Sequence, residues 1–595
     1  MTPFSTILAL ILISGLTYIH LNLLPKALHS IPRTSRSGGN SGHHEERCEG
    51  SKVITPELSA YIGETMRISN TAGLSVAIVP KDGDPYLKAW GYRSEEGEEI
   101  TSDTLFHIAS VSKAFCASAL GILMDDFANG RNVTALPPKL TEITWHTKVK
   151  DLLPDDWELM DEWASEHANL KDILAHVSGV MRHDFSYGLH DTTMDLVKRL
   201  KYLRPGFELR EQWSYNNIMF VVGAHIVSKY ANQPYTSFVQ ERIFVPLDMS
   251  STTFSPRKAA ESGKYTQAWT KAGRLIPDVF TEEFAFTSAG SGGIISNAID
   301  MSKWIATWLN EGVYNGTAVI PRSVYWNTTL SYAIYRGHPA DASQSISGYG
   351  LGWFRGSYRG HDSVSHAGGI PGATTLVSFF PGDGFGVLVF ANGGDQDVQV
   401  KSISNRIIDK ILCLVDPHPV ENRSPAVSFE PKVIEIVSTA SNLPVSLNDL
   451  AGTYTNPGYG TFTLCSSNST SFYCSKVYTA FTTVDGVRGN LNPSVELLAE
   501  WSRFWSSHVR MRHKGGMVFS VYMTSLFPNG YGKDSSPFET AEVGISPIMA
   551  EFVIDHGKVS GFGVIGLEGR QIERARLGST VKDRAEVWFD KVRIV

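Results

Sequence analysis

The sequence predicts an α+β fold for its central region, because strand patterns stand at both ends of that region and helical patterns lie between them. Residues 74–80 (LSVAIVP) have a strand pattern, and residues 86–93 (YLKAWGYR) follow across a Lys-Asp-Gly-Asp turn. Much later, residues 374–380 (TTLVSFF) and 385–393 (FGVLVFANG) flank Pro-Gly-Asp-Gly and predict an antiparallel hairpin. The intervening stretches are mainly helical, for example 170–175 and 218–230. This order favours an antiparallel sheet flanked by a helical region over a doubly wound parallel sheet.

The last part of the chain predicts a second, antiparallel β structure. From residue 450 onward, strand-like segments alternate with turn residues at short spacing, which is typical of a meander or a small barrel. The segments are GTYTNPGYGTFTL, VYTAFTTV, GGMVFSVYMTSL and AEFVIDHGKVSGFGVIG. Residues 417–443 contain several prolines and few periodic patterns, so we interpret them as a linker between a domain at 51–416 and one at 444–595.

Length and composition agree with a folded protein of more than one domain. The chain has 595 residues, and one domain usually holds about 100–200. A hydrophobic fraction of 42% excludes wholesale disorder. With 53 basic and 60 acidic residues the net charge is −7, so no basic excess is available to neutralise phosphates. These numbers argue against a nucleic-acid partner.

The first 25 residues predict export from the cytosol. Residues 4–24 contain no Asp, Glu, Lys or Arg, as expected of a signal peptide or a signal anchor. Whether the leader is cleaved stays open, and residues 26–50 are predicted to form a flexible spacer. Five glycosylation sequons, beginning at Asn132, Asn315, Asn327, Asn422 and Asn468, also favour a secreted glycoprotein. Contact with a membrane is expected only through an uncleaved leader.

The five cysteines do not form a disulfide scaffold. Cys465 and Cys474 flank a short polar stretch and could close a hairpin as a disulfide. Cys116 and Cys413 lie in apolar helical contexts and are predicted to be buried thiols. Cys48 has no assignment.

The sharpest candidate for chemistry is Ser110-Val-Ser-Lys113, at the start of a predicted helix that ends before Gly130. A serine in the first turn feels the positive end of the helix dipole, which favours an anionic oxygen there. A lysine three residues later projects from the same face. If burial removes its proton, its amine can activate the serine hydroxyl.

The Ser-x-x-Lys spacing alone is weak, because the chain repeats it at Ser255 and at Ser579, where an N-capping serine is the simpler interpretation. What distinguishes Ser110 is the sequence that follows it. Tyr215-Asn-Asn217 enters an apolar helix, and residues 366–369 (HAGG) lead into a strand.

The order Ser-x-x-Lys, Tyr-x-Asn, His-x-Gly resembles the serine β-lactamase and penicillin-binding-protein superfamily, on its class C and esterase side. The resemblance covers roughly residues 55–415 and includes DTLFHIASVSKAF, DILAHVSGV, PGFELREQWSYNN, IFVPLDMSSTTF, AGSGGIISNAIDMSKW, YGLGW and SHAGGIPG. The later segment LAGTYTNPGYGTF is similar to the lipocalin-like barrel attached to many members of this family, fungal ones included.

The resemblance implies a β-lactamase/transpeptidase-like domain and a role for each motif residue. Ser110 would be the nucleophile that forms an acyl-enzyme, with Lys113 and Tyr215 sharing the general-base work. Lys113 would also favour the phenolate form of Tyr215. Asn217 would hydrogen-bond Lys113 and a substrate amide. No cofactor and no metal is implied.

The same resemblance assigns a substrate-binding edge to residues 366–369. The oxyanion would lie between the backbone N–H groups of Ser110 and Gly369, and Gly368 would let the strand approach closely. His366 and Ala367 depart from the Lys-Thr of penicillin-directed enzymes. This departure removes a permanent cation, which argues against antibiotic hydrolysis as the physiological role. An imidazole at His366 would titrate near pH 6.5, so carboxylate-bearing substrates would gain a cationic partner only in acid.

These observations predict a secreted serine hydrolase that acts on a small-molecule or peptide acyl substrate, whether ester, amide or lactam. Two alternatives stay open, an acyltransferase that uses the same site and a non-catalytic binding protein that retained the fold. A rival reading places an α/β-hydrolase elbow at residues 289–293 (AGSGG), but the segment before it is a poor strand. His176 is interpreted as a structural turn histidine, and the sequence contains no HExxH motif. The oligomeric state is not predicted.

Overall fold

The computed structural model describes residues 53–132, 134–414, 443–488, 495–542, 548–567 and 578–593, which all belong to one unit of the chain. The predicted leader (1–25), the spacer (26–50), the sequon at Asn422 and all but the last residue of the predicted linker (417–443) lie outside the described residues. Within the described ranges, no helix is both long enough and apolar enough to cross a membrane.

The central sheet joins the two ends of the predicted α+β region. It has eight antiparallel strands in the order β2-β1-β14-β13-β12-β11-β10-β9. Strands β1 and β14 pair with Leu74 opposite Ala391, although these residues are far apart in the sequence. Both predicted hairpins are present, and the α+β fold class is confirmed. The strands are β1 (Gly73–Pro80), β2 (Tyr86–Gly91), β9 (Ala333–Arg336), β10 (Ser347–Tyr349), β11 (Phe354–Tyr358), β12 (His361–Ile370), β13 (Ala373–Phe380) and β14 (Phe385–Ala391).

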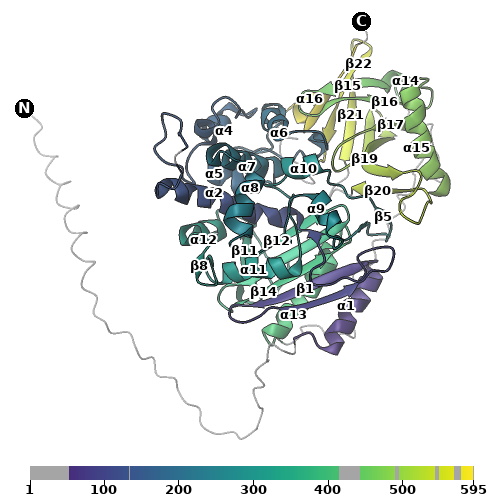
Figure 1. The fold of residues 1–595 in the computed structure, drawn as a ribbon. Coiled ribbons are helices and arrows are strands. Elements are labelled where there is room, and N and C mark those ends of the chain that lie inside the picture. The colour runs from purple at the N-terminus through teal and green to yellow at the C-terminus, as the bar shows by residue number, and fades with distance from the viewer. Residues whose placement is uncertain are drawn as a thin grey trace, which may run out of the picture. The chain divides into compact units, whose positions relative to one another are not determined.

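Both faces of this sheet are covered, because side chains alternate along its central strands. In β1, Val76 and Ile78 pack in the core under α1 (Pro56–Ile68) and α13 (Asp397–Ile411) (Figure 1). Ala77 and Val79 face the opposite way, into the larger core shared with the helical region. Burial on both faces explains why β1 and β14 are continuous apolar runs.

The helical region is built around α2 (Ser112–Ala128), which is buried on almost every side. Phe115 of α2 stacks on Trp304 with ring centroids 3.8 Å apart. Gly223 lets α7 lie close to α2, because a Cβ there would stand 3.2 Å from Cys116 Sγ. The other helices of this region are α3 (Val149–Leu152), α4 (Glu162–His167), α5 (Leu170–Leu174), α6 (Thr193–Arg199), α7 (Asn217–Ala231), α8 (Tyr235–Val239), α9 (Pro256–Glu261), α10 (Glu282–Thr287), α11 (Ala298–Leu309) and α12 (Arg322–Thr329).

The C-terminal sheet is a nearly closed antiparallel barrel, which confirms the predicted second β structure. Its strand order is β16-β15-β23-β22-β21-β19-β18-β17, with β20 also paired to β19. Cys465, directly after β16, and Leu498 of β17 donate backbone hydrogen bonds to each other, so the two ends of the sheet meet. The strands are β15 (Gly452–Asn456), β16 (Gly460–Leu464), β17 (Glu496–Glu500), β18 (His508–Gly515), β19 (Val518–Phe527), β20 (Phe538–Glu542), β21 (Ile548–Asp555), β22 (Lys558–Ile565) and β23 (Val587–Lys591). Likeness to a lipocalin stays a prediction.

The segment VYTAFTTV is helical, not a strand as predicted. It lies within α15 (Phe472–Arg488), where Val477, Phe481 and Val484 are buried on one face. These positions are four and three residues apart, so a helix brings them together against the apolar side chains of β17 and β19, whereas a strand would split them between two faces. The β-branched composition misled the prediction, because packing outweighs intrinsic propensity.

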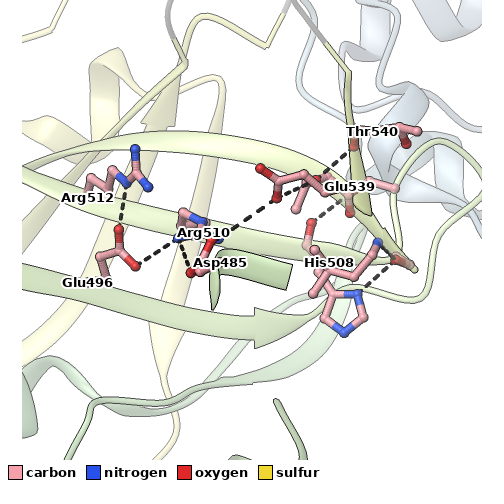
Figure 2. Close-up of polar contacts among 11 residues, drawn as sticks. Asp485, Glu496, His508, Arg510, Arg512, Glu539 and Thr540 are labelled. Carbon is pink, nitrogen blue, oxygen red and sulfur yellow. Dashed lines mark hydrogen bonds and ion pairs between the residues drawn. The ribbon is translucent and has the colours of Figure 1, made fainter. Parts of the chain in front are cut away.

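A buried cluster of charged side chains links α15 to the strands of the barrel (Figure 2). The guanidinium of Arg510 on β18 donates to Asp485 of α15 at 2.7 and 3.0 Å and to Glu496 of β17 at 3.1 Å. Glu496 also accepts from Arg512 at 2.6 Å. Burial works to lower the pKa of Arg510, but the hydrogen bond to Asp485 and the surrounding carboxylates outweigh it and raise that pKa. Removing one partner would leave an uncompensated buried charge, so the cluster ties helix and strands together.

The cysteines follow the predictions only in part. Cys465 and Cys474 form a disulfide, and it joins the end of β16 to α15 rather than closing a β-hairpin. Cys116 is a buried free thiol, as predicted. The prediction for Cys413 is wrong, because this residue is exposed and disulfide-bonded to a partner outside the described residues.

Candidate active site

Ser110 lies on a single 3₁₀ turn, η2 (Ala109–Val111), directly before α2. The turn ends where α2 begins, so the serine stands at the positive end of a long buried helix, as the sequence predicts. Ala109, the residue before it, has φ +45°, a left-handed conformation that is costly for any residue other than glycine. Strain of this kind persists only where the surrounding packing holds it.

Lys113 is fully buried and lies one turn further along the helix. Its Nζ donates to Ser110 Oγ at 3.1 Å, to Asn217 Oδ1 at 2.7 Å and to the Ser291 carbonyl oxygen at 2.6 Å. Burial, and secondarily the positive charge of Arg182, lowers the pKa of Lys113 well below its ordinary value. Both effects favour the neutral amine over the ammonium, and a neutral amine can accept the proton of Ser110 directly.

Tyr215 contacts the same hydroxyl from the other side. Its phenol donates to Ser110 Oγ at 2.7 Å, and Lys113 Nζ lies 4.8 Å from its ring centroid. Burial raises the pKa of Tyr215, and Arg182 offsets this only in part. The expectation that Lys113 favours the phenolate is thus not met, because desolvation dominates and the phenol stays protonated. In this arrangement the lysine can act as a base and the tyrosine as a proton donor.

Asn217 opens α7 and is held in a fixed orientation. Its Nδ2 donates to Asp184 Oδ1 at 2.9 Å, which turns its Oδ1 toward Lys113. The neighbouring Asn216 caps the helix by accepting from the backbone N–H of Met219. The predicted hydrogen bond between Asn217 and Lys113 is present.

Sequence reasoning missed Arg182 and Asp184. Arg182 pairs with Asp184 through its Nε, and its guanidinium lies 4.9 Å from the ring centroid of Tyr215. Its side chain is 44% exposed, so a permanent cation stands at the edge of the site. The available signal was this pair of opposite charges two residues apart in the segment VMRHDFSY.

Strand β12 passes beside the turn that carries Ser110, and only glycine permits the approach. A Cβ on Gly368 would lie 2.3 Å from the Ile108 carbonyl oxygen and 2.4 Å from Thr375 Oγ1. A Cβ on Gly369 would meet nothing within 4 Å, and this residue lines the same cavity as Ser110. The structure thus brings Gly369 to the serine, as the predicted oxyanion arrangement requires.

His366 is not a titrating group on the cavity wall. It is 2% exposed, its Nε2 lies 3.0 Å from the Tyr349 hydroxyl, and its Nδ1 lies 2.6 Å from the carbonyl oxygen of Ala367. Burial, followed by repulsion from Lys113, lowers its pKa to about 3. The expectation of titration near pH 6.5 is therefore wrong, and the imidazole is neutral from pH 5 to 8. A part for His366 in substrate binding stays a prediction.

The cavity at Ser110 is open to solvent, and its lining is mostly apolar. Its polar side chains include those of Ser110, Arg182 and Asn217. Its apolar side chains come from the helical region, from β12 and from the C-terminal sheet, namely Leu196, Ile218, Val221, Phe280, Phe284, Ile370, Phe504 and Trp505. Such a lining suits an apolar ligand group whose orientation is set by a few polar contacts.

The rival assignments fail on local structure. Ser291 follows the helix α10, whereas a nucleophile elbow requires a preceding strand, and its carbonyl serves Lys113. Ser255 is the N-cap of α9, accepting from the Lys258 backbone N–H at 3.1 Å. Ser255 is therefore a helix-capping residue, as predicted.

His176 is structural, as predicted. It is fully buried with φ +60°, and its Nδ1 accepts from the backbone N–H of Asn216 at 3.1 Å. Burial and the nearby Lys113 lower its pKa well below the ordinary value, so it stays neutral. The described part of the chain contains no group of three or more His, Cys, Asp or Glu side chains that could hold a metal ion.

Residues 58–409 match the Beta-lactamase family, and the chain belongs to it. It is 29% identical over 347 residues to "Unguisins hydrolase ungD'" of Aspergillus campestris, a match that covers 57% of this chain and 62% of the relative. It is 25% identical over 450 residues to "Unguisins hydrolase ungD" of Aspergillus violaceofuscus, covering 70% of this chain and 77% of the relative. The predicted family is confirmed.

A solved structure shares this fold over most of the chain. The octameric penicillin-binding protein homologue from Pyrococcus abyssi superposes with a TM-score of 0.52 at 17% identity, over 85% of this chain and 97% of that one. This likeness shows the shared fold.

Proposed function

We propose that the protein is a secreted serine hydrolase that cleaves esters, amides or lactams through an acyl-enzyme on Ser110. The observation that carries the proposal is that one hydroxyl oxygen lies within hydrogen-bond distance of two proton-transfer groups. Ser110 Oγ is 3.1 Å from Lys113 Nζ and 2.7 Å from the Tyr215 hydroxyl. Nucleophile, base and donor thus converge on the wall of an apolar cavity.

In the first half-reaction, Ser110 Oγ attacks the substrate carbonyl carbon while its proton passes to the neutral amine of Lys113. The oxyanion forms between the backbone N–H groups of Ser110 and Gly369. When the intermediate collapses, the bond to the leaving group breaks, and that group takes a proton from Tyr215, which Lys113 replenishes. In the second half-reaction, water attacks the carbonyl carbon of the acyl-enzyme and gives up a proton to the same pair. The bond between that carbon and Ser110 Oγ then breaks, the pair returns the proton to Oγ, and the acid is released.

The names of the two Aspergillus relatives support hydrolysis over transfer to another acceptor. Acyl transfer would use the same residues and differ only in the group that attacks the acyl-enzyme. A neutral His366 at the position of the usual lysine supports a role other than antibiotic hydrolysis. Secretion is supported by the apolar leader and by the exposure of the sequon residues Asn315 and Asn468.

Covalent labelling tests the proposal. A fluorophosphonate probe should add to the tryptic peptide that contains Ser110, as read by mass spectrometry. Ser110→Ala should lower turnover of a chromogenic ester about a thousandfold or more, because only binding and oxyanion stabilisation remain. Ser255→Ala is the matched control, since it changes another Ser-x-x-Lys serine and should keep full turnover. An adduct on Ser291, or full activity in Ser110→Ala, would refute the assignment.

A substrate screen on the purified protein can narrow the range of possible acyl donors. Chromogenic esters, D-amino-acid amides and cephalosporins should be compared by kcat/KM. We expect neutral esters and amides to be turned over faster than cephalosporins. Preferential turnover of cephalosporins would contradict the argument from His366.

A further inference from the structure

A loop of the C-terminal sheet forms part of the wall around Ser110. Residues 501–507 connect β17 to β18, and Phe504 and Trp505 from this loop line the same cavity as the serine. The Phe504 ring packs against those of Phe284 and Phe280, with centroids 4.7 and 5.1 Å apart. Aromatic side chains of the helical region and of the C-terminal sheet thus meet at the candidate active site.

Hydrogen bonds connect this loop to the residues that orient Asn217. The Phe504 backbone N–H donates to the Tyr187 carbonyl oxygen, and Trp505 Nε1 donates to the Tyr187 hydroxyl, both at 3.1 Å. That hydroxyl donates in turn to Asp184 Oδ1 at 2.7 Å, the same oxygen that accepts from Asn217. The loop is therefore fixed at two points and cannot shift without disturbing the residues that orient Asn217.

The chemistry of the cavity defines what it can accept. Rings of Phe504, Trp505 and Phe284 form one part of the lining, and aliphatic side chains form much of the rest. The exposed cation of Arg182 stands among few polar groups. Burying a charged or strongly polar substituent against these rings would be costly, whereas an aromatic or large aliphatic group gains contact.

We propose that Phe504 and Trp505 are specificity-determining residues that select acyl donors with a bulky apolar group beside the scissile carbonyl. This inference rests on the proposed acyl-enzyme at Ser110. It assigns the C-terminal sheet a part in substrate choice, because the sheet supplies one side of the acyl pocket.

The test compares para-nitrophenyl 3-phenylpropionate with para-nitrophenyl acetate, whose acyl group carries only a methyl group beside the carbonyl. Wild type should prefer the phenyl ester in kcat/KM. Phe504→Ala and Trp505→Ala should each lower that preference about tenfold, the size expected when an apolar pocket loses one side. Trp588→Ala is the matched control, because Trp588 lies on β23 and its indole N–H donates to Asp590 at 2.7 Å. It should leave the preference unchanged.

Two further variants keep the test decisive if the alanine variants unfold. Trp505→Phe keeps a ring but removes the N–H donor, so it should keep most of the preference, and Phe504→Leu should lower it several-fold. Probe labelling of Ser110 is measured in every variant. Labelling with an unchanged preference in all four loop variants would overturn this inference alone, whereas wild-type protein without labelling would overturn the proposed function.

Discussion

Arg182 is the residue that most influences proton affinity around Ser110 without touching it. Its guanidinium lies beside Tyr215 and, after burial, is the next strongest influence on the pKa values of both Lys113 and Tyr215. Arg182 lowers both pKa values, because a nearby cation disfavours a protonated amine and favours a phenolate. With His366 neutral, Arg182 supplies the permanent positive charge at the site.

Arg182→Gln should therefore move the acid limb of activity to higher pH. The base must be unprotonated, so kcat/KM rises as pH passes the pKa of Lys113. Loss of the cation raises that pKa, and the remaining charge of Asp184 acts in the same direction. The measurement is kcat/KM for a neutral ester across pH 5 to 10. Arg182→Lys keeps the charge and should lie close to wild type, and an unshifted limb in Arg182→Gln would contradict this account.

At the scale of elements, the site depends on how closely β12 approaches the turn η2. The strand contributes Gly369 to the cavity, while Gly368 packs against the backbone of Ile108. Adjacent residues of a strand face opposite sides of the sheet, so a Cβ would be crowded at Gly368 and free of contacts at Gly369. The geometry around Ser110 follows from this contact between elements far apart in the sequence.

The two glycines provide a matched pair for stability. Gly368→Ala places a methyl group 2.3 Å from a carbonyl oxygen, which must push the strand away. We expect it to lower the free energy of unfolding by about 1–3 kcal/mol. The added methyl group of Gly369→Ala would meet nothing within 4 Å, so this variant should lower the free energy of unfolding much less. Chemical denaturation of both variants against wild type measures the difference, and equal losses would mean that β12 does not lie against η2 as described.

At the scale of the whole molecule, a buried histidine joins the helical region to the C-terminal sheet. His183 Nδ1 lies 2.9 Å from the hydroxyl of Tyr459, in the β15–β16 turn, and its Nε2 lies 2.8 Å from the Arg204 carbonyl oxygen. The guanidinium of Arg204 continues the contact by donating to the carbonyl oxygens of Lys582 and Ala585. Burial lowers the pKa of His183 to about 4, although the hydrogen bond to Arg204 works against it.

This histidine should make the protein less stable in mild acid. The unfolded state takes up a proton near pH 6.5 and the folded state only near pH 4, so its contribution is full above pH 6.5 and is lost between those values. The difference corresponds to about 3 kcal/mol. Urea unfolding of wild type and His183→Gln at pH 7.5, 6 and 5 measures it. The variant should be less stable at pH 7.5 but change less with pH. Parallel pH dependence in the two proteins would exclude His183 as the cause.

Local patterns were enough for most of the elements and for the spacing of Ser110 and Lys113. The hairpin of β13 and β14, and the placement of Ser110 and Lys113 one helical turn apart, depend on residues close in sequence, whose spacing is read directly. The order of three short motifs was enough for the family. The exception, α15, has a β-branched composition that a strand would also explain, and only its packing against β17 and β19 distinguishes the two.

Tertiary structure alone decided the proton affinities and the shape of the cavity. Whether His366 titrates near pH 6.5 or near 3 depends on what covers it, and the cover comes from Tyr349 on another strand. The place of Arg182 beside Tyr215, and of Phe504 beside Ser110, likewise requires the chain to bring distant segments together. Burial and electrostatic coupling are properties of neighbours in space, and spacing along the sequence does not specify them.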